Sequence, residues 1–224
     1  MSRVLVIAAH LDDEVLGVGG TIQRHVSQGD EVIVLNVSDR TFDGRVDVET
    51  VSMLNQQAKR VAEKLGVSRI DHGNQPDKYL DRCLVDTVRP IERVFSEYQP
   101  EIVYTHHHGD VNQDHRAVFE ATVVAIRSFK SPYLIAAYAY EILSSTELIS
   151  GAMQGRQFSP NYFVTLQEKD VQIKIEAMEE YYTEVMEYPF PRSSEGIRIL
   201  AQFRGMQVGR HYAEAFEVIK LVKL

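Results

Sequence analysis

The stretch Val4-Leu5-Val6-Ile7-Ala8-Ala9-His10-Leu11-Asp12-Asp13-Glu14 joins an apolar run to a histidine and three carboxylates. Residues 4–9 are apolar without alternation, which is typical of a strand buried on both faces of a parallel sheet. Carboxylates are favourable at the N-terminus of a helix, and we expect that helix to continue to about Gln28. The stretch therefore predicts a strand–turn–helix unit whose turn carries chemically active side chains.

The same alternation of strands and helices continues along the chain. Further strands are expected at residues 31–37, 68–72, 101–105, 133–142, 162–164 and 215–222, and further helices at residues 49–65, 85–98, 113–127, 171–187 and 195–208. Pro90 is expected to bend or interrupt its helix, and Gly66 suits a helix C-cap. This alternation predicts an α/β fold with a mostly parallel sheet, helices on both faces and a single domain over residues 1–224.

Composition limits the classes of function. The 224 residues carry a formal net charge of −8, which argues against non-specific nucleic-acid binding and against attraction to an anionic membrane. The apolar run at residues 4–9 is too short for a signal peptide or a membrane span, and no later segment is long enough, so a cytoplasmic location is expected. The single cysteine, Cys83, cannot form an internal disulfide and is predicted to be a small core residue.

A second polar cluster follows the strand expected at residues 101–105. It reads Thr105-His106-His107-His108-Gly109-Asp110-Val111-Asn112-Gln113-Asp114-His115. In open parallel sheets, ligands bind outside the C-terminal ends of the strands. Because both clusters follow such strands, we expect them to converge on one site.

Together the clusters supply a set of metal ligands. His10 and Asp13 are three residues apart across a strand-to-helix turn and can reach the same point, and His115 adds a third ligand. Two histidines and one carboxylate, with one position open to water, suit a catalytic zinc site. Asp12 then lies beside the metal, where a carboxylate can take a proton from water and return it to a leaving group.

Neighbouring residues are candidates for supporting roles. Asp114 is expected to orient a ligand histidine. Asn112, His106 and His107 are candidates for hydrogen bonds to the substrate or to the developing oxyanion. Each cluster also has a simpler explanation, the first as an acidic helix start and the second as a solvated loop. The metal site is favoured because each cluster supplies what the other lacks.

The glycines in Gly17-Val18-Gly19-Gly20 raise the alternative of dinucleotide binding. They come well after the strand end, they do not form G-x-G-x-x-G, and the turn carries carboxylates that would repel a pyrophosphate. Close packing of a helix on the sheet explains these glycines better.

The chain resembles the LmbE-like family, also called the PIG-L family of N-acetylglucosaminyl de-N-acetylases. Residues 9–14 match its motif A-H-P-D-D-E with Leu11 in place of proline, and residues 105–115 match T-H-H-P-x-D-x-N-x-D-H with His108 in place of proline. The resemblance continues through residues 75–81, 140–146 and 204–216, and so covers essentially the whole chain.

The resemblance implies a Rossmann-like fold and a zinc enzyme. By it, His10, Asp13 and His115 would bind Zn²⁺, and Asp12 would act as general base and acid. The implied reaction is hydrolysis of the N-acetyl group of a small-molecule amino sugar. Fe²⁺, Co²⁺ or Mn²⁺ would also suit these ligands, and relatives often form homo-oligomers.

Departures from the family pattern leave two points open. Some members have histidine at the position of Asn112 and use it to stabilise the tetrahedral intermediate, so His106 or His107 is an alternative for that role here. Arg40 and Arg45, in the loop after residues 31–37, are candidates for contacts with a phosphate or with sugar hydroxyls. Two other functions remain: hydrolysis of another small amide at the same metal site, and a catalytically silent sugar-binding module.

Overall fold

The sheet is built around β1, which the stretch at residues 4–9 predicts. The computed structural model describes residues 1–39, 48–149 and 155–223. Within these residues the strands are β1 (Arg3–Ala8), β2 (Glu31–Ser38), β3 (Arg69–Gln75), β4 (Ile102–His106), β5 (Ala136–Tyr140), β6 (Tyr162–Leu166) and β7 (Tyr212–Leu221). They form one seven-stranded sheet in the order β3-β2-β1-β4-β5-β7-β6. The mostly parallel α/β sheet is confirmed.

The central strands are parallel, and β7 runs the opposite way to its neighbours on both sides. β1 pairs in parallel with β2 and β4, and β4 pairs in parallel with β5. β7 is antiparallel to both β5 and β6. The C-terminal ends of β1 and β4 therefore lie side by side at one edge of the sheet, and each is followed by one of the two polar clusters.

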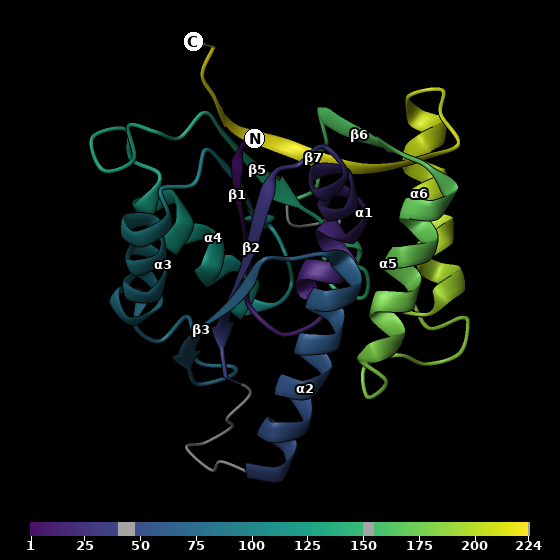
Figure 1. Cartoon of the computed structure of the whole chain (residues 1–224), viewed down its shortest axis with the longest axis horizontal. Helices are drawn as coiled ribbons and strands as arrows, with labels where there is room; N and C mark the ends of the chain where they lie inside the picture. Colours follow the sequence, from purple (N-terminus) through teal and green to yellow (C-terminus); the bar gives the residue numbers. More distant parts are fainter. Residues whose placement is uncertain (40–47, 150–154, 224) are drawn as a thin grey trace.

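Helices cover both faces of the sheet, as expected. They are α1 (Asp13–Ser27), α2 (Val48–Leu65), α3 (Leu84–Tyr98), α4 (Gln113–Ala125), α5 (Glu168–Glu180) and α6 (Ser194–Gln207), with a 3₁₀ turn η1 (Thr146–Leu148). Figure 1 shows α3 and α4 on one face and α1, α2, α5 and α6 on the other. Residues of β1 alternate between the two cores: Val4 and Val6 pack under the larger group of helices, and Leu5 and Ile7 pack under α3 and α4.

The glycines of α1 explain how that helix packs so closely. A side-chain methyl group at Gly17 would overlap the ring of Tyr140 in β5, and one at Gly20 would overlap Leu166. These contacts confirm the prediction that the glycines of α1 allow close packing of the helix on the sheet.

Gly66, after α2, has φ of +71°, which suits its predicted place as a C-cap.

Three local predictions were wrong. Cys83 is exposed and precedes α3, so it is not a core residue. α3 continues from Leu84 to Tyr98 with the buried Pro90 inside it, so the helix is not interrupted there. α5 ends at Glu180, where a turn begins, instead of continuing to Glu187. None of the described helices is long and apolar enough to cross a membrane.

Candidate active site

The turn between β1 and α1 places two aspartates at the N-terminus of α1. Asp12 is the N-cap and has φ of 106°, in the left-handed region. Residues other than glycine rarely adopt this conformation, and such strain is common at functional sites. The backbone amide of His10 donates to Oδ2 of Asp13 at 2.8 Å. Both aspartates are buried, so the turn fixes two carboxylates in a place shielded from bulk water.

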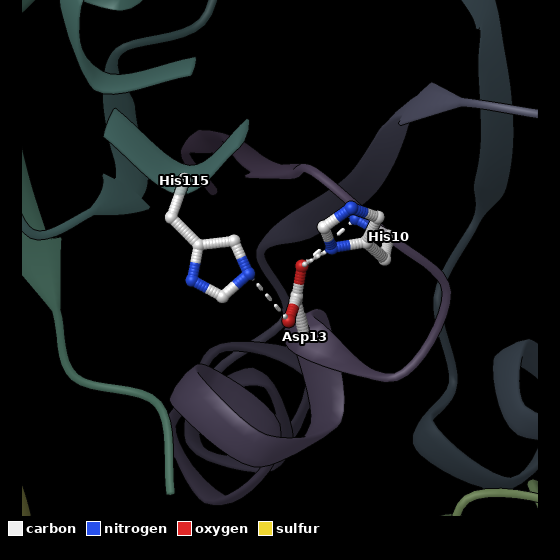
Figure 2. A group of neighbouring side chains, drawn as sticks. All are labelled: His10, Asp13 and His115. Atoms are coloured by element: carbon white, nitrogen blue, oxygen red, sulfur yellow. Dashed lines mark hydrogen bonds and ion pairs between the residues drawn. The ribbon is translucent and has the colours of Figure 1, made fainter. Parts of the chain in front are cut away.

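His115 reaches Asp13 from the first turn of α4. Figure 2 shows Asp13 between the rings of His10 and His115. Nδ1 of His10 lies 3.3 Å from Oδ2 of Asp13, and Nε2 of His115 lies 3.4 Å from Oδ1. The structure thus brings together the three residues that the sequence proposes as metal ligands, although they come from two distant segments.

A further carboxylate holds each histidine through its other ring nitrogen. Oδ2 of Asp114 lies 3.1 Å from Nε2 of His10, and Oδ2 of Asp110 lies 3.2 Å from Nδ1 of His115. These contacts fix the ring orientations, so that Nδ1 of His10 and Nε2 of His115 face Asp13. Carboxylates on the outer nitrogen are the usual support of metal-binding histidines.

The supporting carboxylates are themselves anchored. Asp114 accepts hydrogen bonds from the backbone amides of Lys78 at 2.7 Å and Leu80 at 3.1 Å. Asp110 accepts one from the hydroxyl of Thr146 at 2.6 Å. Because these bonds come from two segments outside α4, the orientation of both histidines is built into the fold.

His106 lies behind the cluster. Its Nε2 accepts a hydrogen bond from the amide of Ala9 at 2.9 Å, and its ring stacks on His115 with centroids 4.0 Å apart. Burial lowers the pKa of His106 to about 4, and His115 acts in the same direction. The side chain has no exposed surface, and its ring packs against that of His115.

The charges around Asp13 are strongly coupled. Burial alone would lower the pKa of His115, but the carboxylates of Asp13 and Asp110 raise it to about 9. Burial would likewise raise the pKa of Asp13, yet His115 and His106 hold it well below its usual range. Positive charge at this point is therefore stabilised by the surrounding carboxylates, whether a proton or a cation carries it.

The donor set fits a metal ion. Nε2 of His115 is buried and has no hydrogen-bond partner, although it faces Asp13. Buried polar atoms without a partner are uncommon in proteins. Two imidazole nitrogens and a carboxylate oxygen that face one another are the ligands of many catalytic zinc sites.

A pocket of about 400 Å³ opens beside the cluster. Its wall is formed by His10, Asp12, Asp77, Lys78, Asn112, Gln113, Asp114, Glu184 and Arg192. Arg192, from the segment before α6, donates through Nη1 to Oδ2 of Asp12 at 2.5 Å and through Nε to the hydroxyl of Ser144 at 2.7 Å. Asp12 is thus held at the boundary between the cluster and the pocket.

Of the candidates for substrate contact, Asn112 is described by the structure and two arginines are not. Oδ1 of Asn112 caps α4 by accepting the amide of Asp114 at 2.9 Å, and the side chain lies on the pocket wall. Arg40 and Arg45 lie outside the described residues.

The structure places His107, another candidate for binding the oxyanion, against Glu217 of β7. Its Nδ1 lies 2.8 Å from Oε2 of Glu217 in β7, and its Nε2 lies 2.8 Å from the carbonyl oxygen of Arg156. The ring has no exposed surface. Both ring nitrogens are therefore engaged within the protein, and no contact with the pocket is seen.

The structure adds three residues to the site. Asp110 orients His115, Arg192 binds Asp12, and Oδ1 of Asp77 lies 3.1 Å from Nε2 of His10. Asp110 could be predicted from the sequence, since it is a second carboxylate within the cluster at residues 105–115. No sequence feature predicts Arg192, because it is a lone arginine in a segment far along the chain.

Fold and site together define an α/β protein with a histidine–carboxylate cluster, fit for a metal, at the C-terminal edge of a parallel sheet. The chain belongs to the PIG-L family: the family model described as GlcNAc-PI de-N-acetylase matches residues 5–126, more than half of the 224 residues. The resemblance drawn from the sequence motifs is therefore confirmed.

Characterised relatives cover nearly the whole chain. The chain is 25% identical, over 238 residues, to the diacetylchitobiose deacetylase of Thermococcus kodakarensis, covering 98% of this chain and 84% of that protein. The N,N'-diacetylchitobiose deacetylase of Pyrococcus horikoshii has a similar structure (TM-score 0.78, 21% identity, 97% of this chain and 84% of that chain). So does GalB, the 4-carboxy-2-hydroxymuconate hydratase of Pseudomonas putida KT2440 (TM-score 0.76, 22% identity, 100% and 98%). The structural likeness shows a shared fold and does not by itself decide the chemistry.

Proposed function

We propose that this protein is a zinc-dependent N-deacetylase, which hydrolyses the acetamide group of an N-acetylamino sugar or of its conjugate. The observation that carries the proposal is the buried set of His10, Asp13 and His115 beside Asp12, next to a pocket of about 400 Å³. Membership of a family described by a de-N-acetylase supports it, as does the similarity to a diacetylchitobiose deacetylase.

The ion would be held by Nδ1 of His10, a carboxylate oxygen of Asp13 and Nε2 of His115. Asp114 and Asp110 would keep the two rings in place through their outer nitrogens. When bound there, Zn²⁺ supplies a Lewis acid that polarises an amide carbonyl and lowers the pKa of water. Fe²⁺, Co²⁺ and Mn²⁺ would suit the same ligands.

Asp12 is the proton carrier of the proposed reaction. Water attacks the acetamide carbonyl carbon, and Asp12 takes the proton that the water loses. Asp12 then gives this proton to the sugar nitrogen as the C–N bond breaks, so that acetic acid and an amine leave and ionise to acetate and an ammonium group. The ion pair with Arg192 orients the Asp12 carboxylate toward the pocket for both steps.

Asn112 is our candidate for stabilising the oxyanion. Its Oδ1 is used to cap α4, which leaves Nδ2 as the donor of the same amide group on the pocket wall. A preorganised donor at that point stabilises developing negative charge. We prefer Asn112 to His107, because Glu217 and the Arg156 carbonyl occupy both ring nitrogens of His107.

The pocket wall carries charges of both signs. The described wall has four carboxylates, those of Asp12, Asp77, Asp114 and Glu184, and the cations of Lys78 and Arg192. A bound Zn²⁺ would add two positive charges and bring the total close to neutral. Comparison of the phosphorylated and unphosphorylated forms of one N-acetylamino sugar therefore measures which of them the site prefers.

The test is acetate release from a panel of N-acetylamino sugars, including diacetylchitobiose and matched phosphorylated and unphosphorylated monosaccharides. Asp12→Asn should lower kcat by roughly 10²- to 10⁴-fold and retain zinc, whereas His115→Ala should lose both zinc and activity. Asp30→Asn, which alters a partly buried pair with His25 away from the active site, should leave both unchanged. Loss of zinc in Asp12→Asn would make Asp12 a ligand instead of the base.

The same panel separates the competing functions. Turnover of another small amide, with no acetate released from any sugar, would replace the deacetylase with an amidohydrolase that uses the same metal site. Sugar binding without turnover of any amide would identify a silent binding module.

A further inference from the structure

A second group of potential metal ligands lies outside the active-site cluster. His107 and His108 follow the end of β4, and Glu217 lies on β7. Nδ1 of His107 is 2.8 Å from Oε2 of Glu217, and Nδ1 of His108 is 4.0 Å from the same oxygen. Their donor atoms lie within 4.8 Å of one another. None of the three belongs to the proposed deacetylase machinery.

Both histidines present the same ring nitrogen to Glu217, because a backbone carbonyl holds the other one. Nε2 of His107 lies 2.8 Å from the carbonyl oxygen of Arg156, and Nε2 of His108 lies 3.2 Å from that of Gly155. A carbonyl on Nε2 keeps the proton there and leaves Nδ1 as the ligand atom. This outer contact is the one that metal-binding histidines usually make.

The carboxylate is oriented and the group is accessible. Oε1 of Glu217 accepts the backbone amide of Ser159 at 2.6 Å, which leaves Oε2 directed at the two rings. His107 is buried, but 43% of the His108 side chain is exposed, so an ion can enter from solvent. His108 also stands where the family motif has proline, so a member with that proline lacks this ligand.

We propose that His107, His108 and Glu217 form an accessory Zn²⁺ site, with water completing the coordination. Two histidines and a glutamate are an established zinc ligand set, with bond lengths of about 2.0–2.2 Å. Two bonds to one ion span the 4.0 Å between Nδ1 of His108 and Oε2 of Glu217, so His108 keeps its contact with Gly155, and the ion displaces the proton on Nδ1 of His107 to solvent. Gly155, Arg156 and Ser159 are hydrogen-bonded to His108, His107 and Glu217. A bound ion would therefore stabilise the packing of this segment against the sheet.

The experiment measures zinc per chain after saturation and removal of loose metal. The wild type should hold a second equivalent beyond the active-site ion. His108→Ala should lose that equivalent, and His211→Ala, which removes an exposed histidine elsewhere, should keep it. His115→Ala should retain only the accessory ion, and zinc should still raise its melting temperature. The double variant His108→Ala/His115→Ala should show neither retained zinc nor this rise.

These outcomes are independent of deacetylase activity. A single equivalent in the wild type, removed by His115→Ala, would overturn the accessory site and leave the proposed function intact. A second equivalent that persists in His108→Ala would overturn it too. In that case Asp77→Asn tests the other described grouping, in which His10 and Asp114 are shared with the active site.

Discussion

Oδ2 of Asp110 lies 3.2 Å from Nδ1 of His115, and this contact turns the opposite ring nitrogen toward Asp13. Burial alone would raise the pKa of Asp110, but hydrogen bonding to His115 lowers it to about 2. The carboxylate is therefore charged across the physiological range. It makes the ring of His115 a better metal ligand and also fixes its direction.

Asp110→Asn should weaken zinc binding by roughly 10- to 100-fold, because the amide neither orients the ring as strongly nor carries the charge. Competition with a chromogenic chelator measures the affinity. The matched control is Asp30→Asn, which changes a partly buried aspartate–histidine pair away from the active site, between Asp30 and Nδ1 of His25 at 2.8 Å. Equal loss of affinity in both variants would show that the effect is not specific to His115.

Arg192→Ala should lower kcat on the order of 10²-fold, because Asp12 loses the partner that orients it and small misplacements of a catalytic group are costly. Zinc content should not change, since Arg192 contacts none of the three proposed ligands. Arg192→Lys should recover only part of the rate, because one ammonium cannot bind Asp12 and Ser144 as the guanidinium does. If zinc content falls in parallel with kcat, Arg192 acts on the metal cluster and not on Asp12.

The sequence carries enough information to place the cluster, because that placement follows from simple rules. An uninterrupted apolar run predicts β1 as a buried central strand, and the rule that ligands bind at C-terminal strand ends brings residues 10–13 and 115 together. The glycines in α1 likewise predict close packing. These features depend on local pattern and on topology, and both can be inferred from one chain.

Arg192 and Cys83 show where this reasoning fails. Arg192 reaches Asp12 across 180 residues from a segment with no regular structure, and no local pattern reports such a contact. Residue type and an amphipathic pattern predict that Cys83 lies in the core, but it lies just before α3, where the chain turns at the surface. Contacts made by irregular segments depend on the whole tertiary structure.

The pair formed by His107 and Glu217 should stabilise the metal-free protein over a limited pH range. Burial would lower the pKa of His107, but Glu217 and the Arg156 carbonyl raise it; burial would raise the pKa of Glu217, but His107 lowers it. The His107 contribution is complete below its unfolded pKa and is lost as pH rises through its raised folded pKa. The Glu217 contribution is present above its unfolded pKa and is lost as pH falls through its lowered folded pKa.

The melting temperature of the wild type minus that of Glu217→Gln, measured with a chelator present, should therefore be largest at about pH 5–6.5, between the two unfolded pKa values. The difference should shrink in stronger acid and in alkali. A difference that is constant with pH would mean that the glutamate contributes by packing and not by its charge.

Gly17→Ala should lower the free energy of unfolding by about 1–3 kcal/mol, the usual cost of overpacking a core. The added methyl group meets the ring of Tyr140, which is fully buried and cannot move aside. Gly19→Ala is the comparison in the same helix, because its methyl group would lie 3.0 Å from Cγ of the buried Lys174, a milder contact than the overlap with the Tyr140 ring. Both variants gain the same helix propensity, so the difference between their urea denaturation curves reports the difference between the two contacts.

Gly17→Ala should also lower activity, because the Tyr140 hydroxyl donates to the carbonyl of Ile7 at 2.7 Å and lies 3.2 Å from Nε2 of His106. A displaced Tyr140 ring moves His106 and, through the stacked rings, His115. Equal stability of the Gly17→Ala and Gly19→Ala proteins would show that β5 and α1 can separate at low cost. The glycine would then not be required for the close approach of helix and sheet that supports the metal turn.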